Sequence, residues 1–208
     1  DDGLIECVGV TNMDVPHLQT IVDAGVPVVA HQLQYSLLDR RPTHGMVDCC
    51  RAHDITLLCY GALAGGFLHE RWHGVPDPAR DGLAALENRS LVKYRLIIEE
   101  FGGWDPFQGL LDTLAAIATR HATTIGAVAI RWVLDQPGVG AVIAGARNTT
   151  HLPQTLAAVA LRFDDADRAR INAVLARSQG PAGDCYELER VMGGRHAVIM
   201  RTNLNASA

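Results

Sequence analysis

The sequence lacks the features that would place this protein in a membrane or on nucleic acid. No apolar run among its 208 residues approaches the roughly 18 residues of a membrane-spanning helix, and the first residues are acidic where a signal peptide is basic. The net charge is only −5, and one lysine, Lys93, and the arginines are scattered among 23 acidic residues. Because no basic face is predicted, we expect neither a nucleic-acid nor a membrane partner.

Cysteine is also too sparse for a disulfide framework or a structural zinc site. Five cysteines are an odd number, and a reduced, cytoplasmic protein fits them best. Cys49, Cys50 and His53 lie within helical reach of one another, but no second ligand pair at zinc spacing completes them. The sequence therefore predicts no metal site.

Apolar strand-like runs alternate with amphipathic helices along the chain. A long insertion, 67–105, with one clear helix at 91–101, interrupts the alternation after the third strand. We expect a strand–helix domain over 1–177 and an irregular C-terminal tail over 178–208 that lies over the active-site face. The predicted strands are 4–10, 26–35, 55–60 and 139–144, and the later helices are 107–121, 125–134, 150–160 and 164–176.

Four such strand–helix units predict an α/β fold with a parallel sheet and right-handed crossovers. The chain begins directly on a strand-like segment, so we expect that something normally precedes it. Periodicity leaves two arrangements open, a doubly wound sheet and part of an eight-stranded barrel. In both, ligands bind at the carboxyl ends of the strands.

The residues at these strand ends are of the kinds that a nicotinamide dinucleotide needs. Asn12 and Gln32 can each donate to and accept from a carboxamide, and Tyr60 can stack on a ring. Glycines after the third and fourth strands allow backbone to approach phosphate closely. The sequence thus favours a dinucleotide site.

Five blocks of sequence, in order, resemble the aldo/keto reductase family. The resemblance implies a (β/α)8 TIM barrel of which this chain holds the C-terminal half, strands five to eight, with the insertion after its third strand. The blocks are 9–12 (GVTN), 31–41 (HQLQYSLLDRR), 58–66 (LCYGALAGG), 131–139 (RWVLDQPGV) and 142–148 (VIAGARN).

The resemblance also implies a role for each cofactor residue. Three residues would hold the nicotinamide carboxamide, a tyrosine would stack under its ring, three residues would offer backbone to the pyrophosphate, and two would approach the 2′-phosphate of NADP. NAD remains an alternative to NADP. The carboxamide residues are Thr11, Asn12 and Gln32, and the stacking residue is Tyr60. The pyrophosphate residues are Gly61, Leu63 and Gly65, and the 2′-phosphate residues are Gly145 and Arg147.

The family's catalytic aspartate, tyrosine, lysine and histidine belong to strands two to four, so the resemblance implies that this chain holds none of them. Lys93 lies in the inserted helix rather than at a strand end. We therefore expect the C-terminal part of an NAD(P)H-dependent reductase of small carbonyl or sugar substrates, inactive alone, whose barrel needs a missing N-terminal half or a second copy. The alternative is a non-catalytic NADP-binding or scaffolding half-barrel that pairs with another chain.

Overall fold

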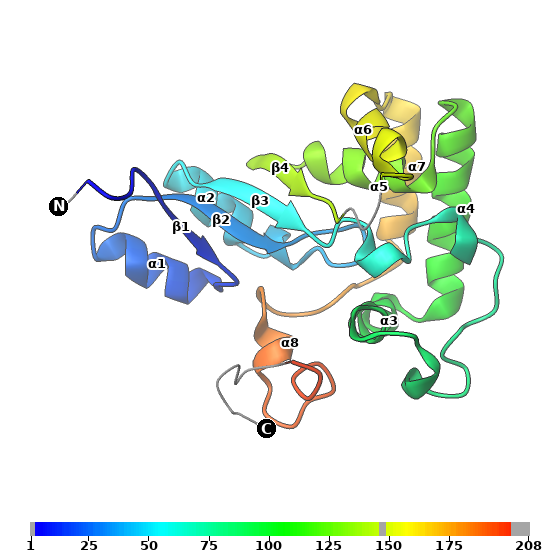
Figure 1. The fold of residues 1–208 in the computed structure, drawn as a ribbon, viewed down its shortest axis with the longest axis horizontal. Coiled ribbons are helices and arrows are strands. Elements are labelled where there is room, and N and C mark those ends of the chain that lie inside the picture. The colour runs from blue at the N-terminus through cyan, green and yellow to red at the C-terminus, as the bar shows by residue number, and fades with distance from the viewer. Residues whose placement is uncertain (1–2, 146–148, 201–208) are drawn as a thin grey trace.

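The computed structural model describes residues 3–145 and 149–200 and contains one four-stranded parallel sheet (Figure 1). The strands lie side by side in the order in which they occur along the chain. A doubly wound sheet reverses its strand order at a switch point, whereas a barrel does not. The α/β prediction with four parallel strands is confirmed, and the strands are β1 (Val8–Thr11), β2 (Val28–Gln34), β3 (Thr56–Tyr60) and β4 (Val139–Ile143).

The predicted helices form within a few residues of their expected bounds, because capping residues define their starts. Asp14 accepts the His17 N–H at the first helix, and Asp164 forms a capping box with Asp167 at the seventh. The helices are α1 (Val15–Asp23), α2 (Met46–Ala52), α3 (Arg89–Phe101), α4 (Trp104–Arg120), α5 (Ile125–Leu134), α6 (Leu152–Ala160), α7 (Asp165–Leu175) and α8 (Glu187–Arg190).

The first strand is shorter than the sequence predicted. The apolar run at residues 4–10 suggested a strand over its whole length, but β1 begins at Val8. Leu4, Ile5 and Cys7 of this run are all exposed. Apolar composition alone predicted this start wrongly, because nothing in the described part of the chain buries these residues.

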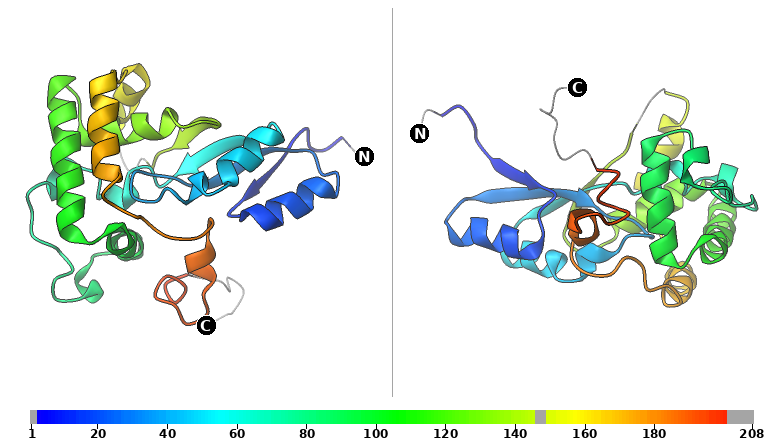
Figure 2. Two further views of the ribbon diagram at one scale, coloured as in Figure 1. Left: turned by 180° about the vertical axis from the view of Figure 1, so that it is seen from behind. Right: turned by 90° about the horizontal axis from the view of Figure 1, so that it is seen from below.

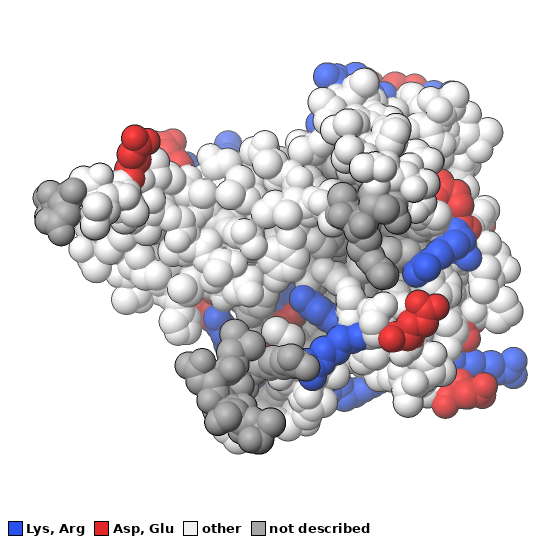
Figure 3. Space-filling view, viewed as in Figure 1, with Lys and Arg blue, Asp and Glu red and all other residues white. Residues whose placement is uncertain are grey.

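The two faces of the sheet have different surroundings. Helices cover one face, where Leu33, Leu57 and Cys59 are completely buried; seen from behind, α2 crosses in front of the strands (Figure 2, left). The register places Gln32 and Leu58 side by side on the opposite face. No helix lies across that face in Figure 1, and it is largely uncharged in Figure 3. We call it the open face of the sheet.

An aromatic cluster fixes the long insertion after β3. The ring of Phe67 lies 5.0 Å from that of Trp72 and 6.0 Å from that of Trp104, centroid to centroid. The Trp104 ring lies in turn 5.0 Å from that of Phe107, which is completely buried on α4. These contacts pin the insertion against α4.

The C-terminal segment, 178–200 in the described part of the chain, returns from α7 to the carboxyl ends of the strands (Figure 1, orange). The Asp184 carboxylate accepts the Val15 N–H at 2.8 Å, at the start of α1. The Arg190 guanidinium donates to the Asn12 carbonyl oxygen at 3.1 Å. This segment therefore reaches the loop where cofactor residues were predicted.

Candidate functional site

Thr11, Asn12 and Gln32 meet where β1 and β2 end. The Thr11 hydroxyl and the Asn12 backbone N–H both donate to the Gln32 carbonyl oxygen, each at 3.1 Å. Asn12 has φ 57°, a left-handed conformation that asparagine tolerates better than most residues. The side chain of Gln32 is exposed on the open face. Both amides thus lie at the same edge of the sheet.

Tyr60, the last residue of β3, is joined to this group by its hydroxyl. The hydroxyl donates to Asn12 Oδ1 at 3.1 Å and lies 2.8 Å from the hydroxyl of Tyr186, in the C-terminal segment. Burial raises the pKa of Tyr60, so the hydroxyl stays protonated at neutral pH. A protonated hydroxyl can act as the donor that this arrangement requires.

The turn after β3 is closed and tightly packed. The Gly61 carbonyl accepts the Ala64 N–H at 2.8 Å, and the Leu63 carbonyl accepts the Gly66 N–H at 2.9 Å. Gly65 has φ +63°, and a Cβ there would lie 2.6 Å from Cδ2 of Tyr94 on α3. The predicted pyrophosphate turn is thus held directly against the inserted helix.

The fourth strand contributes less to this group. Gly145 is exposed two residues beyond Ile143, whose register partner on β3 is Tyr60. No described contact joins Gly145 to the other predicted cofactor residues, and Arg147 lies outside the described residues. The structure therefore brings together the residues predicted for the nicotinamide end.

Lys93 lies closer to the strand ends than the sequence predicted. Its position in the inserted helix suggested distance from the strand ends, yet its Nζ lies 5.5 Å from the centroid of the Tyr60 ring and 5.4 Å from that of Tyr94. Burial lowers the pKa of Lys93, while the carboxylates of Glu189 and Asp39 oppose that change. Its helical spacing gave no sign of this, because only the packing of α3 on the turn decides it.

A buried charged cluster adjoins the site at the end of β2. The guanidinium of Arg41 is 2% exposed and binds the carboxylates of Asp39 and Glu189, each with a contact of 2.7 Å. Burial alone would raise the pKa of Glu189, but hydrogen bonds from Arg41 lower it below its ordinary value. Sequence analysis missed this cluster because Glu189 is remote along the chain.

His31 is buried behind Gln32 and is neutral in the folded protein. Its Nε2 accepts the Met13 N–H at 3.2 Å, and burial lowers its pKa from 6.5 to about 4. Below pH 6.5 the unfolded chain therefore binds a proton that the folded chain does not, so stability falls as the pH falls toward 4.

This linkage gives a measurable pH dependence. Between pH 7 and pH 5 we expect His31 to account for a loss of roughly 2 kcal/mol in the free energy of unfolding. Urea unfolding at both values should show a smaller loss for His31→Asn than for the wild type, while the exposed His53→Asn control should keep the wild-type loss. Equal losses in all three proteins would contradict the assignment.

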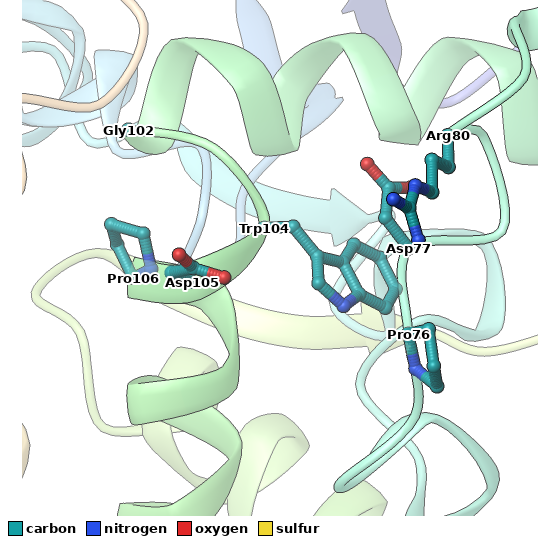
Figure 4. A pocket seen from close by; sticks show the side chains of 7 residues that line it. All are labelled: Pro76, Asp77, Arg80, Gly102, Trp104, Asp105 and Pro106. Carbon is teal, nitrogen blue, oxygen red and sulfur yellow. The ribbon is translucent and has the colours of Figure 1, made fainter.

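A separate pocket of about 430 Å³ lies between the insertion and the start of α4 (Figure 4). Pro76, Asp77 and Arg80 line one side, and Trp104 and Asp105 lie on the other. None of the predicted cofactor residues lines it.

The described residues offer no site for a metal ion: within 3–145 and 149–200, no group of three or more His, Cys, Asp or Glu side chains is arranged to hold one. In the same ranges, no helix is long and apolar enough to span a bilayer.

The sequence matches a known family over most of its length. The family model described as "Aldo/keto reductase family" matches residues 1–176. Over 168 residues the chain is 25% identical to the NADH-specific methylglyoxal reductase of Escherichia coli (strain K12), covering 80% of this chain and 47% of the relative. Over 133 residues it is 31% identical to flagellar radial spoke protein 5 of Chlamydomonas reinhardtii, covering 63% of this chain and 24% of the relative.

Solved structures share the fold. The glycerol dehydrogenase AKR11B4 from Gluconobacter oxydans superposes with a TM-score of 0.69 at 23% identity, over 88% of this chain and 53% of the other. The holo form of aldo-keto reductase AKR11C1 from Bacillus halodurans gives 0.62 at 20% identity, over 91% and 55%. The four strands and their helices thus match part of a (β/α)8 barrel, and the chain spans about half the length of these proteins or less.

Proposed function

Because this chain belongs to the aldo/keto reductase family, we propose that it is the C-terminal part, strands five to eight, of an NAD(P)H-dependent enzyme that reduces a small carbonyl compound or oxidises a sugar or alcohol. The observation that carries the proposal is the 3.1 Å hydrogen bond from the Tyr60 hydroxyl to Asn12 Oδ1. It unites the ends of β1 and β3 at the edge where a barrel binds its ligand. The chain then supplies the cofactor side of the active site.

The residues of this edge fit the nicotinamide end of such a cofactor. Amide and hydroxyl groups of Thr11, Asn12 and Gln32 would bind the carboxamide, and the Tyr60 ring would stack on the nicotinamide. The backbone of the turn after β3, at Gly61, Leu63 and Gly65, would face the pyrophosphate, and Gly145 and Arg147 the 2′-phosphate. When bound, the cofactor supplies the hydride.

NADP is the proposed cofactor, and NAD is the alternative. A guanidinium at position 147 suits a 2′-phosphate. The names of relatives point both ways, since one is NADH-specific and another, from Schizosaccharomyces pombe, is designated NADP(+). Titration with each cofactor in parallel distinguishes the two.

We further propose that the chain is inactive until another half completes the barrel. β1 and β4 are unpaired on their outer edges within the described sheet, and Ile143 on the open face is 45% exposed. Such edges and faces favour association. An upstream segment carrying the family's Asp, Tyr, Lys and His, or a second copy, would cover them.

The domain proposal assigns 1–177 to the partial barrel and 178–208 to a tail over the active-site face. The hydroxyl contact of Tyr186 with Tyr60 supports that placement of the tail.

We also propose a cytoplasmic location for the protein. All five cysteines are free thiols, which is typical of a reducing compartment.

Fluorescence titration with NADPH tests the cofactor proposal. The wild type is expected to bind, Tyr60→Leu to lose about tenfold or more in affinity because the stacked ring is removed, and Tyr60→Phe to stay within a few-fold. Absence of NADPH and NADH binding at millimolar concentration would overturn the proposal for this chain.

The second candidate is a non-catalytic half-barrel that scaffolds an assembly. The 31% identity to a flagellar radial spoke protein favours it, since that relative is named for a structure rather than for a reaction. Reading the gene upstream of residue 1 separates the candidates. An in-frame extension with the catalytic Asp, Tyr, Lys and His supports the enzyme, and its absence together with a stable oligomer in light scattering supports the scaffold.

A further inference from the structure

The guanidinium of Arg41 holds two carboxylates of different origin. Asp39 lies two residues away in the same turn, and it is fixed there by the Gln34 amide, which donates to Asp39 Oδ2 at 2.6 Å. Glu189 comes from α8 in the C-terminal segment and binds both terminal nitrogens of Arg41, at 2.7 and 2.9 Å. The first contact is thus built into the β2 turn, whereas the second is supplied from elsewhere in the chain.

We propose that Arg41, together with Lys93, forms a binding subsite for a carboxylate or phosphate group, and that the side chain of Glu189 occupies this subsite in the present structure. A bidentate guanidinium matches the two oxygens of a carboxylate or a phosphate. Arg41 is almost fully buried, so its geometry is fixed before a ligand arrives. The Glu189 carboxylate is an internal substitute for such a ligand.

The subsite adjoins the residues predicted to face the nicotinamide ring. Lys93 attracts the Glu189 carboxylate and packs over the Tyr60 ring. Three residues before Glu189, the Tyr186 hydroxyl contacts the Tyr60 hydroxyl at 2.8 Å and accepts the Gln34 N–H at 3.2 Å. A ligand that replaced Glu189 would therefore extend toward the end of β3.

When the Glu189 carboxylate leaves the subsite, the charges that remain should attract another anion. With Glu189 in place, two cations, Arg41 and Lys93, face two carboxylates. Without it, Asp39 alone opposes them, and an uncompensated buried charge is costly. Gln34 Oε1 is also buried without a hydrogen-bond partner among the described residues, so it can accept from a ligand hydroxyl.

The attachment of the C-terminal segment is compatible with displacement. Beyond α8, Val191, Met192 and Val198 are more than half exposed. Little apolar burial therefore holds the stretch after α8, where Arg195 and His196 pair with Glu99 and Glu100, whereas Cys185 and Tyr186 before α8 are buried. A ligand anion can compete with Glu189 for Arg41.

This inference rests on the proposed function in naming a substrate class. If the chain serves a carbonyl reductase, its substrate carries a carboxylate or phosphate group beside the reacting carbonyl. The anion would be held by Arg41 and Lys93, at the position that Glu189 fills. Free inorganic phosphate contains the same group and serves as the probe.

The test compares Glu189→Gln with the matched control Glu187→Gln. Glu187 is exposed on the same short helix and accepts the Asp184 N–H. Isothermal titration with sodium phosphate, against chloride at equal ionic strength, should show saturable binding to Glu189→Gln at millimolar phosphate. In that concentration range the wild type and Glu187→Gln, in which Glu189 fills the subsite, should show no binding. Phosphate should also raise the melting temperature of Glu189→Gln alone.

A second measurement uses the wild type, so the proposal can be tested even if Glu189→Gln folds poorly. Hydrogen exchange of amides 184–190 should become faster in high phosphate than in matched chloride, because the anion displaces Glu189. Unchanged exchange, or equal phosphate binding by all three proteins, overturns the subsite. NADPH titration of the same samples separates the two proposals, since anion binding without cofactor binding refutes the proposed function and leaves the subsite standing.

Discussion

The Arg41→Met variant is expected to lose about 3–5 kcal/mol in the free energy of unfolding, because it leaves the carboxylates of Asp39 and Glu189 buried without their shared cation. Both carboxylate side chains are at most 5% exposed, so water cannot take over the role of the guanidinium. Such a loss is a large part of the about 5–15 kcal/mol that stabilises a typical domain. Urea unfolding followed by circular dichroism measures it.

Two comparisons make this prediction specific. Arg168→Met removes an ion pair with Asp135 whose arginine side chain is 49% exposed, and it should cost less than about 1 kcal/mol. The double variant Arg41→Met/Glu189→Gln should be more stable than Arg41→Met, because it removes one of the uncompensated charges. If Arg41→Met and Arg168→Met lose the same amount, the buried cluster does not stabilise the fold.

Gly65→Ala is expected to destabilise the protein by about 2–5 kcal/mol and to displace α3. The left-handed conformation at φ +63° costs an alanine about 1–2 kcal/mol, and overpacking adds about 1–3 kcal/mol. The added Cβ would lie 2.6 Å from a ring carbon of Tyr94 and 2.9 Å from the Ser90 hydroxyl oxygen, both on α3. Since Lys93 is on the same helix, its contact with the Tyr60 ring should also be lost.

Gly74→Ala is the matched control for this effect. Gly74 has φ +71°, and nothing lies within 4 Å of an added Cβ, so only the conformational cost of about 1–2 kcal/mol applies. Chemical denaturation of both variants measures the difference. If Gly74→Ala is as destabilised as Gly65→Ala, then close packing of the turn against α3 is not what requires glycine at position 65.

Local signals in the sequence account for most of the fold. The run at 55–60 and the cap at Asp164 act on neighbouring residues, so β3 and α7 form close to where periodicity predicted them. The start of β1 differs because burial depends on neighbours that are remote along the chain, and Leu4 stays 85% exposed. Periodicity likewise could not choose between a doubly wound sheet and a barrel, and the order of the strands decided that point.

The candidate site, too, could be predicted only in part from the sequence. By itself the sequence determined that Asn12, Gln32 and Tyr60 follow strands, and parallel strands must present such residues at one edge. Only the tertiary structure decided that Lys93 packs over Tyr60 and that Glu189 binds Arg41. Those contacts depend on how α3 and the C-terminal segment fold back across long stretches of chain, and no local periodicity or spacing encodes such a return.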